Sequence, residues 1–409
     1  MASPTQAPKP IRETVHPPLV LNTNKRVPIL RQATHHPVPE PVLPINHSKR
    51  KEEGEQQQQQ QQQSTGIGGK GMTDPTTAAG TTGAEKAVEG SVYFIGTATT
   101  VISYAGARLL TDPNFLHAGD HVHLGPGVSA RRLTDPAVPD LGQLPPVDCV
   151  LLSHYHEDHF DRDVERRLSR DLPIVTTPHA RACLEAVPDA DGGPFRCVRA
   201  LDPFEGILMP VMNERGPAAA ASSESAWPER KPAVRVTGMP GKHVPPGMLD
   251  KVNDLLGAVP PTNGWLVELG WMTTATTKTT TAEEETPEHG EEKFETGYRI
   301  YISGDTLMVD ELKEIPVRLR GDKIDLMLVH LGGTTIPGPN TPLIMVTMDA
   351  KQGVQLMRLV DPDLTIPIHF DDYNVFTSPL DDFKKEVEAA GLAGKVVYLD
   401  RGDEFRFTL

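Results

Sequence analysis

Short apolar runs near residue 91 predict the first β-strands of the chain. Residues 92–95, 100–104 and 108–111 are rich in β-branched and aromatic side chains, and glycine-containing turns separate them. This pattern is typical of a meander, in which consecutive strands pair with each other. We therefore expect the ordered part of the chain to begin near residue 91.

Farther along, apolar runs of strand length alternate with segments of helical period. The expected strands cover residues 149–152, 174–176, 234–236, 265–269, 299–302, 324–329, 365–368 and 396–399. The expected helices cover residues 161–170, 178–186, 307–319, 348–360 and 380–390, and in the last of these Phe383, Val387 and Ala390 share one face. This order predicts an α/β domain in which helices cover sheets.

Three segments lack either period. Residues 1–89 are rich in Pro, Gln, Thr and Gly and include an unbroken glutamine run at 56–63, so we expect a disordered tail before a domain at 90–409. Residues 213–231 and 273–296 are expected to be low-complexity surface loops inserted into that domain.

The expected tail is basic, with eight Lys or Arg and two Glu among its first 51 residues. A solvated tail is the simplest interpretation, and an organelle-targeting or docking tail is the alternative.

The overall composition excludes several classes of protein. The chain has 409 residues and a net charge of −15, which argues against nucleic-acid and anionic-membrane partners. It contains no run of about 18 apolar residues, so we expect no membrane insertion, and residues 1–12 contain no apolar stretch of signal-peptide length. Three cysteines without a CxxC pair favour neither disulfides nor a cysteine zinc site, and a reducing, cytoplasmic location fits best.

The strongest chemical signal is the sequence HYHEDH at residues 154–159. His154 and His156 follow an apolar strand and are two residues apart, so their imidazoles point the same way in extended chain. Asp158 and His159 come next, before a helix whose expected N-cap is Asp161. Four such groups in six residues suit one or two Zn²⁺ ions, with Mn²⁺ and Fe as alternatives. A solvated histidine-rich turn is the competing interpretation.

This motif in its context resembles the metallo-β-lactamase superfamily over residues 91–409. Four further positions match the family pattern in order: Asp112 after an early strand, His243 in Gly-Lys-His, Asp305 in Ser-Gly-Asp-Thr and His369 in Pro-Ile-His-Phe. The resemblance implies a four-layer αβ/βα sandwich.

The resemblance also implies a centre of two divalent cations, Zn²⁺ in the first instance and Mn²⁺ as the alternative. It assigns one cation to His154, His156 and His243, the other to Asp158, His159 and His369, and a bridging role to Asp305. Asp112 would hold the histidine loop in place. Three carboxylates would thus serve catalysis, those of Asp112, Asp158 and Asp305.

Each match has a structural alternative. Asp305 suits a helix N-cap, Asp112 suits a turn with Pro113, His243 lies among prolines, and His369 suits a buried structural histidine. Weaker candidates are Asp371, Asp372 and Tyr373, as residues for the rim of the site, and His121, His123, His179 and His330, and a structural or surface role is the alternative for each.

The expected chemistry is hydrolysis by a metal-bound hydroxide, because two cations lower the pKa of a shared water and polarise the bond under attack. The chain has no GxSxG sequence and no Walker A loop, which excludes serine-hydrolase and ATPase mechanisms. We therefore expect a dinuclear hydrolase acting on a small ester-type substrate, a lactone or carboxylic ester. A phosphodiesterase of the same fold and a non-catalytic metal-binding scaffold are the alternatives.

Within the superfamily, residues 96–100 and 239–243 resemble L-ascorbate-6-phosphate lactonase-like and N-acyl-phosphatidylethanolamine phospholipase D-like proteins. The HWxxR sequence of the phospholipase pattern does not follow His243, which argues against a lipid substrate. The expected partner is a small-molecule substrate, and the sequence predicts no oligomeric state.

Overall fold

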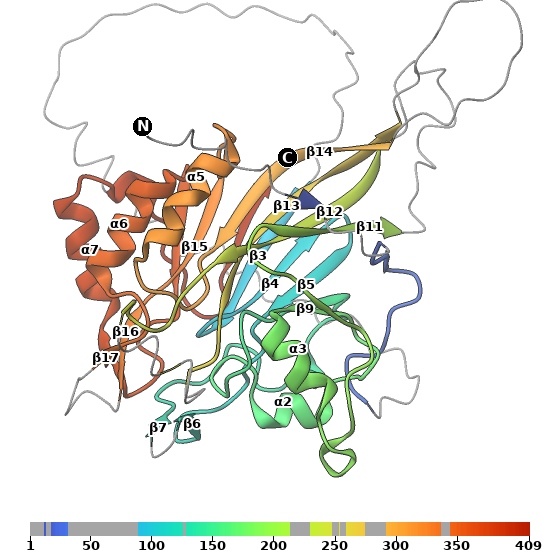
Figure 1. The fold of residues 1–409 in the computed structure, drawn as a ribbon, viewed down its shortest axis with the longest axis horizontal. Helices are drawn as coiled ribbons and strands as arrows, with labels where there is room; N and C mark the ends of the chain where they lie inside the picture. Colours follow the sequence, from blue (N-terminus) through green and yellow to red (C-terminus); the bar gives the residue numbers. More distant parts are fainter. Residues whose placement is uncertain are drawn as a thin grey trace, which may run out of the picture.

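Two β-sheets lie face to face and carry helices on their outer sides (Figure 1). The computed structural model describes residues 12–13, 18–31, 89–125, 128–212, 230–247, 253, 259–274, 292–336 and 344–409. Within these residues the order of layers is helix, sheet, sheet, helix. The predicted four-layer αβ/βα sandwich is therefore confirmed.

The first sheet has seven strands in the order β10-β9-β8-β5-β4-β3-β20. Their bounds are β3 (Glu89–Gly96), β4 (Thr99–Tyr104), β5 (Ala107–Thr111), β8 (Cys149–Leu151), β9 (Ile174–Thr176), β10 (Val198–Ala200) and β20 (Glu404–Thr408). Strands β3, β4 and β5 form the predicted antiparallel meander, and β5, β8, β9 and β10 run parallel. Asp112 and His154 consequently follow the carboxyl ends of the parallel strands β5 and β8 at one edge.

The second sheet has eight strands in the order β1-β11-β12-β13-β14-β15-β18, and β2 also pairs with β11. Their bounds are β1 (Arg12–Glu13), β2 (Leu21–Asn22), β11 (Glu205–Met212), β12 (Lys231–Pro240), β13 (Asn263–Thr274), β14 (Glu292–Ile302), β15 (Leu326–His330) and β18 (Leu364–Ile368). Strands β12, β14, β15 and β18 point in one direction, because β13 is antiparallel to both β12 and β14. The loops that follow these four strands therefore leave the same edge of the sheet.

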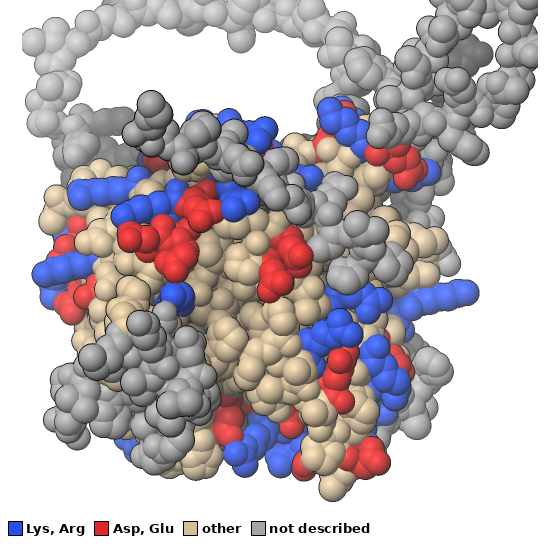
Figure 2. Space-filling view, viewed as in Figure 1, with Lys and Arg blue, Asp and Glu red and all other residues tan. Residues whose placement is uncertain are grey.

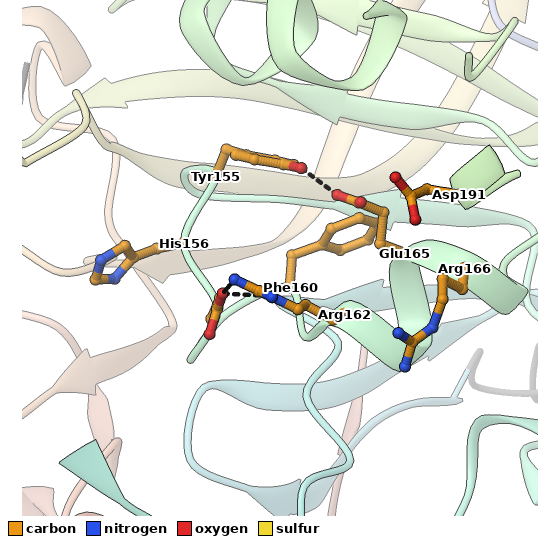
Figure 3. A pocket seen from close by; sticks show the side chains of 8 residues that line it. Tyr155, His156, Phe160, Arg162, Glu165, Arg166 and Asp191 are labelled. Carbon is orange, nitrogen blue, oxygen red and sulfur yellow. Dashed lines mark hydrogen bonds and ion pairs between the residues drawn. The ribbon is translucent and has the colours of Figure 1, made fainter. Parts of the chain in front are cut away.

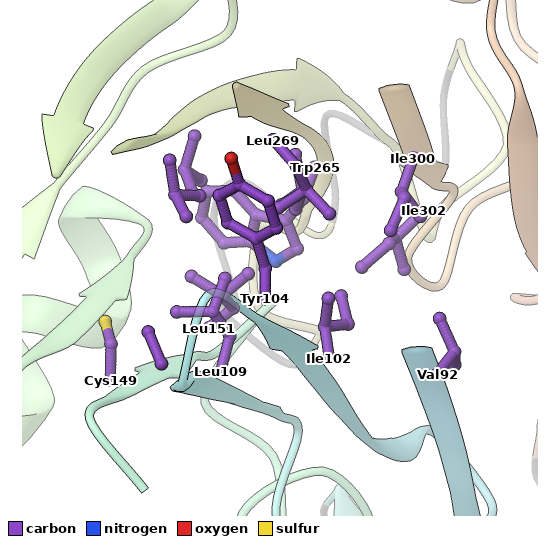
Figure 4. Close-up of a cluster of buried hydrophobic side chains, with 14 of the residues drawn as sticks. Val92, Ile102, Tyr104, Leu109, Cys149, Leu151, Trp265, Leu269, Ile300 and Ile302 are labelled. Atoms are coloured by element: carbon purple, nitrogen blue, oxygen red, sulfur yellow. The ribbon is translucent and has the colours of Figure 1, made fainter. Parts of the chain in front are cut away.

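The space between the sheets is apolar. Side chains alternate along each strand, so one set faces the other sheet. Val92, Ile102 and Leu109 of the first sheet meet Trp265 and Ile300 of the second, all nearly inaccessible to solvent (Figure 4).

The other set of side chains packs under the helices. The helices are α2 (Arg162–Arg167), α3 (Pro178–Glu185), α5 (Glu314–Leu319), α6 (Ala350–Val360) and α7 (Leu380–Ala389). Ile95 belongs to a cluster with Val164 of α2 and Leu184 of α3. Met327 belongs to a cluster with Val354 of α6, to which α7 also contributes. Both sheets are thus apolar on both faces, which explains their continuous hydrophobic runs.

Smaller elements complete the structure. A hairpin of β6 (His121–Gly125) and β7 (Val128–Arg131) lies apart from the two sheets, as does a three-stranded sheet of β16 (Gly332–Ile336), β17 (Ile344–Met345) and β19 (Phe376–Ser378). The 3₁₀-helices are η2 (Leu141–Gln143), η3 (Asp189–Asp191), η4 (Asp310–Lys313) and η5 (Ala393–Lys395). On the face drawn in Figure 2, basic and acidic side chains lie interspersed.

Two local predictions are wrong. The helix expected at 307–319 is a 3₁₀ turn, η4, followed by the short α5. Pro316 explains the late start, because proline has no N–H to donate and is tolerated only in the first turn of an α-helix. The strand expected at 396–399 makes one isolated bridge, between Val396 and Thr365.

The two expected insertions are shorter than predicted. Strand β13 extends to Thr274 and β14 begins at Glu292, so the ends of the segment 273–296 belong to the sheet. Thr273 is buried and its hydroxyl donates to the carbonyl of Lys293. Residues 275–291 and 213–229 lie outside the described residues.

The tail prediction is wrong for residues 18–31. Leu19 and Leu21 are buried in the core between the sheets, and β2 pairs in parallel with β11. Arg26 reaches Asp148, with 2.9 Å between its Nε and a carboxylate oxygen. The physical reason is that pairing with β11, which is far away in the sequence, carries the apolar side chains of this segment into the core. The remaining residues up to 88, apart from β1, lie outside the described part of the chain.

Candidate metal centre

The residues singled out by the family pattern come from loops that leave the sheets at the same edges. Asp112 follows β5, residues 154–159 connect β8 to α2, His243 follows β12, Asp305 follows β14 and His369 follows β18. Their side chains converge into groups whose ligand atoms lie within 4.8 Å of one another. These histidine and aspartate side chains, which come from positions as far apart as 112 and 369, therefore form one polar cluster.

One part of the cluster gathers around His154. The Nε2 atoms of His154 and His243 are 3.1 Å apart. His154 groups with His243 and Asp305, and separately with His156 and Asp158. Of the three histidines that the resemblance assigned to one cation, His154 shares one group with His243 and another with His156. Nδ1 of His156 lies 2.7 Å from a carboxylate oxygen of Asp158.

The other part is a single group of Asp158, His159, Asp305 and His369. Oδ2 of Asp305 lies 3.3 Å from Nε2 of His159 and 3.5 Å from Nε2 of His369. Oδ2 of Asp158 lies 3.8 Å from Nε2 of His159 and 4.0 Å from Nε2 of His369. Asp305 belongs to this group and to the group around His154, which is the position a bridging carboxylate needs.

Unpartnered nitrogen atoms show that these residues fit a cation. Nε2 of His159 and Nε2 of His369 are buried and have no hydrogen-bond partner. In His369 and His243 the other ring nitrogen, Nδ1, lies 2.9 Å from the carbonyl of Leu331 and 3.0 Å from that of Val346. A carbonyl only accepts, so Nδ1 carries the proton and Nε2 keeps its lone pair for a metal ion.

Asp112 holds the histidine loop. Its Oδ1 accepts a hydrogen bond of 2.7 Å from the backbone N–H of Ser153, and its Oδ2 lies 3.2 Å from Nδ1 of His159. Its φ of 36° places it in the left-handed region, a strained backbone that the surrounding contacts maintain. Asp161 is the N-cap of α2, as predicted, and fixes the far end of the loop.

The protonation states favour cation binding. Burial sets the pKa of His154 well below its ordinary value and that of His243 to about 4, so both are neutral at pH 7. Burial alone would raise the pKa of Asp158 and Asp305, but the surrounding imidazoles hold both below their ordinary values. Although burial opposes it, the carboxylates raise the pKa of His159 well above its usual range. The centre therefore combines two anionic carboxylates and the neutral imidazoles of His154 and His243 with His159, whose proton a bound cation would displace.

His330 also belongs to the centre, although the sequence ranked it only among the weaker candidates. It groups with Asp112 and His159, and its Nδ1 lies 2.9 Å from Oδ1 of Asp305. Its position was a usable signal, because His330 ends β15 between the parallel strands β14 and β18 that carry Asp305 and His369.

The other weaker candidates lie outside the groups that could hold a metal ion. Asp372 is buried in a network of its own, and the hydroxyl of Tyr373 accepts a hydrogen bond from Asn114. Three of the others are exposed: His121 and His123 on the β6 hairpin and His179 at the start of α3. The carboxylate of Asp371 lies 3.4 Å from the backbone nitrogen of Leu380.

A narrow pocket leads to the centre. Its polar end is formed by His156, Asp158, His243 and Asp305, and its walls by Leu124, Val259, Pro260, Thr334, Val346 and Thr347. The described residues that line it include no lysine or arginine. This pocket is therefore mostly apolar above its acidic and imidazole end.

A second cleft, of about 430 Å³, is also lined by His156 (Figure 3). Its floor includes the rings of Tyr155 and Phe160, and the Tyr155 hydroxyl donates to Glu165. Arg162 on its rim pairs with Glu157 at 2.5 Å. The two hollows share His156 and differ in polarity.

Comparisons with known proteins agree with this arrangement. A family described as "Beta-lactamase superfamily domain" matches residues 91–369. A UPF0173 metal-dependent hydrolase of Cupriavidus metallidurans is 23% identical over 328 residues, which cover 80% of this chain and 88% of that protein. One of Cupriavidus taiwanensis is 24% identical and covers 77% of this chain and 86% of its own length.

Two solved structures share the fold. An isothiocyanate hydrolase from Delia radicum gut bacteria has a TM-score of 0.54 and 18% identity, and the match covers 78% of this chain and 100% of that one. A possible metal-dependent hydrolase from Veillonella parvula has a TM-score of 0.51 and 18% identity, covering 78% and 99%. Among the described residues, no helix is long and apolar enough to cross a membrane.

Proposed function

Because the chain belongs to the metallo-β-lactamase superfamily, we propose that it is a hydrolase that holds two divalent cations and cleaves a small ester-type substrate. The observation that carries this proposal is the place of Asp305, which belongs to two ligand groups at once. The unpartnered Nε2 atoms of His159 and His369 support it, because a buried nitrogen without a partner is costly unless a ligand satisfies it.

The division of ligands follows the resemblance. His154, His156 and His243 would hold one cation, Asp158, His159 and His369 the other, and Asp305 both. Zn²⁺ is the proposed metal and Mn²⁺ the alternative, since both accept imidazole and carboxylate. When bound, such cations polarise a carbonyl and lower the pKa of water towards neutrality.

The chain's own groups supply orientation and charge. Asp112 fixes the histidine loop through Ser153 and His159, and a carboxylate in this place orients an imidazole ligand and raises its basicity. Asp158 lies at the polar end of the pocket and stays anionic, so it can accept a hydrogen bond from an attacking water. These are the roles we propose for the predicted catalytic carboxylates, together with the bridging role of Asp305.

The pocket walls favour a lactone or carboxylic ester with an apolar substituent. Leu124, Val259 and Val346 offer apolar contact, and the described lining has no lysine or arginine to pair with a phosphate. Thr334 is buried, lines the pocket, and has a hydroxyl without a partner, which is a free donor for a carbonyl oxygen.

A phosphodiester is the second candidate, and the second cleft is the observation that favours it. Arg162 and Arg166 line this cleft, as does His156. Both are already near carboxylates, Arg162 at 2.5 Å from Glu157 and Arg166 at 3.7 Å from Asp163. We therefore rank the ester first.

We also propose that the protein acts in the cytoplasm on a small molecule, without nucleic acid or membrane insertion. The net charge of −15 supports this, as do the three free cysteines, Cys149, Cys183 and Cys197.

The test is metal analysis followed by a substrate panel. Protein purified without chelators should carry about two equivalents of Zn²⁺ or Mn²⁺. It should hydrolyse aryl esters and lactones faster than bis(p-nitrophenyl) phosphate. The reverse preference would establish the phosphodiesterase, and a metal-loaded protein inactive on every substrate would favour the scaffold.

A further inference from the structure

His330 is held in place from two sides. It is fully buried at the end of β15. Its backbone N–H donates to the hydroxyl of Ser303 at 2.9 Å, two residues before Asp305. Its Nδ1 lies 2.9 Å from Oδ1 of Asp305. The ends of β14 and β15 are therefore tied together by one histidine.

The two carboxylate oxygens of Asp305 have different surroundings. Oδ1 contacts His330, whereas Oδ2 faces the ligand nitrogens, 3.3 Å from Nε2 of His159 and 3.5 Å from Nε2 of His369. The hydroxyl of Thr347 donates to Oδ2 at 3.0 Å. Only Oδ2 therefore lies where a cation between these imidazoles would find it.

The orientation of the His330 ring and the nitrogen that carries its proton are set by its contacts. A carboxylate accepts hydrogen bonds, so Nδ1 of His330 is the protonated nitrogen. The ring stacks on His369 with 5.5 Å between centroids and 11° between planes, and on His159 with 6.0 Å and 22°. Its Nε2 is buried without a partner, so the bond to Asp305 is the one polar contact that the described residues give this side chain.

We propose that His330 is a positioning residue whose Nδ1–H captures Oδ1 of Asp305, so that Asp305 presents Oδ2 alone to both cations. This inference rests on the proposed dinuclear function. Without the bond, the carboxylate is free to rotate about its side-chain axis and share its oxygens between neighbours. His330 would thus fix how the bridge is made through its Nδ1, and its Nε2, buried and unpartnered like those of His159 and His369, is not assigned to either proposed cation.

The test compares two replacements of His330 by their metal affinity. His330→Leu removes the donor, and His330→Asn keeps an N–H near the position of Nδ1. Zn²⁺ affinity is measured by competition with a chromophoric chelator, and metal equivalents by elemental analysis. We expect His330→Leu to weaken binding of at least one equivalent by about 10–100-fold, and His330→Asn to restore most of it.

His179→Asn is the matched control, because His179 is exposed on α3 and lies outside every ligand group. It should bind Zn²⁺ as the wild type does. Should His330→Leu fail to fold, judged by circular dichroism, His330→Ala supplies the same comparison without a donor.

Three results would overturn the proposal. Wild-type Zn²⁺ affinity in both donor-free variants would show that the bond positions nothing. Equal losses in folded His330→Asn and His330→Leu would show that a donor is not what matters. Wild-type protein that binds neither Zn²⁺ nor Mn²⁺ would overturn the dinuclear function itself, and of these three results only that one would do so.

Discussion

Two buried polar clusters meet at the segment after β18, and they are built in opposite ways. The candidate metal centre contains His369, whose Nε2 has no hydrogen-bond partner. Three residues later, Asp372 belongs to an arginine cluster, which we define as Arg132, Asp372 and Arg401. The centre is incomplete without a ligand, whereas the carboxylate of the arginine cluster is complete within the protein.

The contacts of Asp372 show this completeness. Its Oδ2 accepts a hydrogen bond of 2.9 Å from the backbone of Thr97. Its Oδ1 accepts one of 2.9 Å from Arg401 and another from the Thr134 hydroxyl. Nη2 of Arg132, the one buried nitrogen of this cluster without a hydrogen bond, is 3.8 Å from the same Oδ1. Every oxygen of the carboxylate is therefore satisfied by the chain.

Thr97 joins the two clusters. Its N–H donates to Asp372, and its carbonyl accepts from the N–H of His369 at 2.8 Å. Both Thr97 and His369 have left-handed backbones, with φ of 51° and 59°. The difference teaches that one buried cluster satisfies its own polar atoms within the chain, whereas the unpartnered atoms of the other are available to a ligand.

The largest effect should come from the incomplete cluster. Changing His154 and His156 together to alanine removes two proposed ligands, so bound metal and hydrolytic activity should both be lost. The fold should persist, because the apolar cores do not include these side chains. Elemental analysis and circular dichroism measure the two effects, and full activity in the double variant would rule out the metal mechanism.

A change in the arginine cluster should lower the stability of the fold without removing the metal. Asp372→Ala leaves Arg132 buried without its carboxylate, and such a loss costs about 3–5 kcal/mol of unfolding free energy. The folded fraction should still bind metal. Urea unfolding measures the loss, and a stable Asp372→Ala protein that lacks metal would reverse our assignment of the two clusters.

Asp112 is expected to have an intermediate effect, because it supports the candidate metal centre without being a proposed ligand. Asp112→Ala removes the acceptor for Ser153 and His159 but no proposed ligand, so metal affinity should fall about 10–100-fold. Chelator competition gives the affinity. A variant that bound metal as tightly as the wild type would show that the histidine loop needs no such support.

A smaller effect should appear at Glu268, a second self-satisfied carboxylate, in β13. Burial opposes its ionisation, yet Arg235 at 2.5 Å and Arg299 at 3.1 Å lower its pKa. A lowered pKa stabilises the folded state above the unfolded value of about 4.3, and that stability is lost as pH falls through the folded pKa.

Glu268→Gln should therefore cost about 1–2 kcal/mol at pH 7 and progressively less below pH 4. Denaturant unfolding of both proteins across this range measures the difference. A difference that stayed constant with pH would mean that the charge of Glu268 contributes nothing.

Local signals in the sequence predicted an α/β order of elements and singled out the HYHEDH loop, whereas the four layers and the proposed ligands outside that loop were implied by the resemblance to the family. Apolar runs located β8 and β18, and the HYHEDH motif located the loop between β8 and α2. His330 was only a weaker candidate because its bond to Asp305 depends on β15 lying next to β14, and no local pattern in the sequence shows which strands are neighbours. Residues 18–31 were missed for the same reason, since Leu21 is buried only through pairing with β11.

The most direct test of the central claim is anomalous diffraction from crystals of the full chain grown with its native metal. The account predicts two anomalous peaks, one beside His154 and His243 and one beside His159 and His369, with Oδ2 of Asp305 between them. A single peak, or peaks away from these side chains, would contradict it.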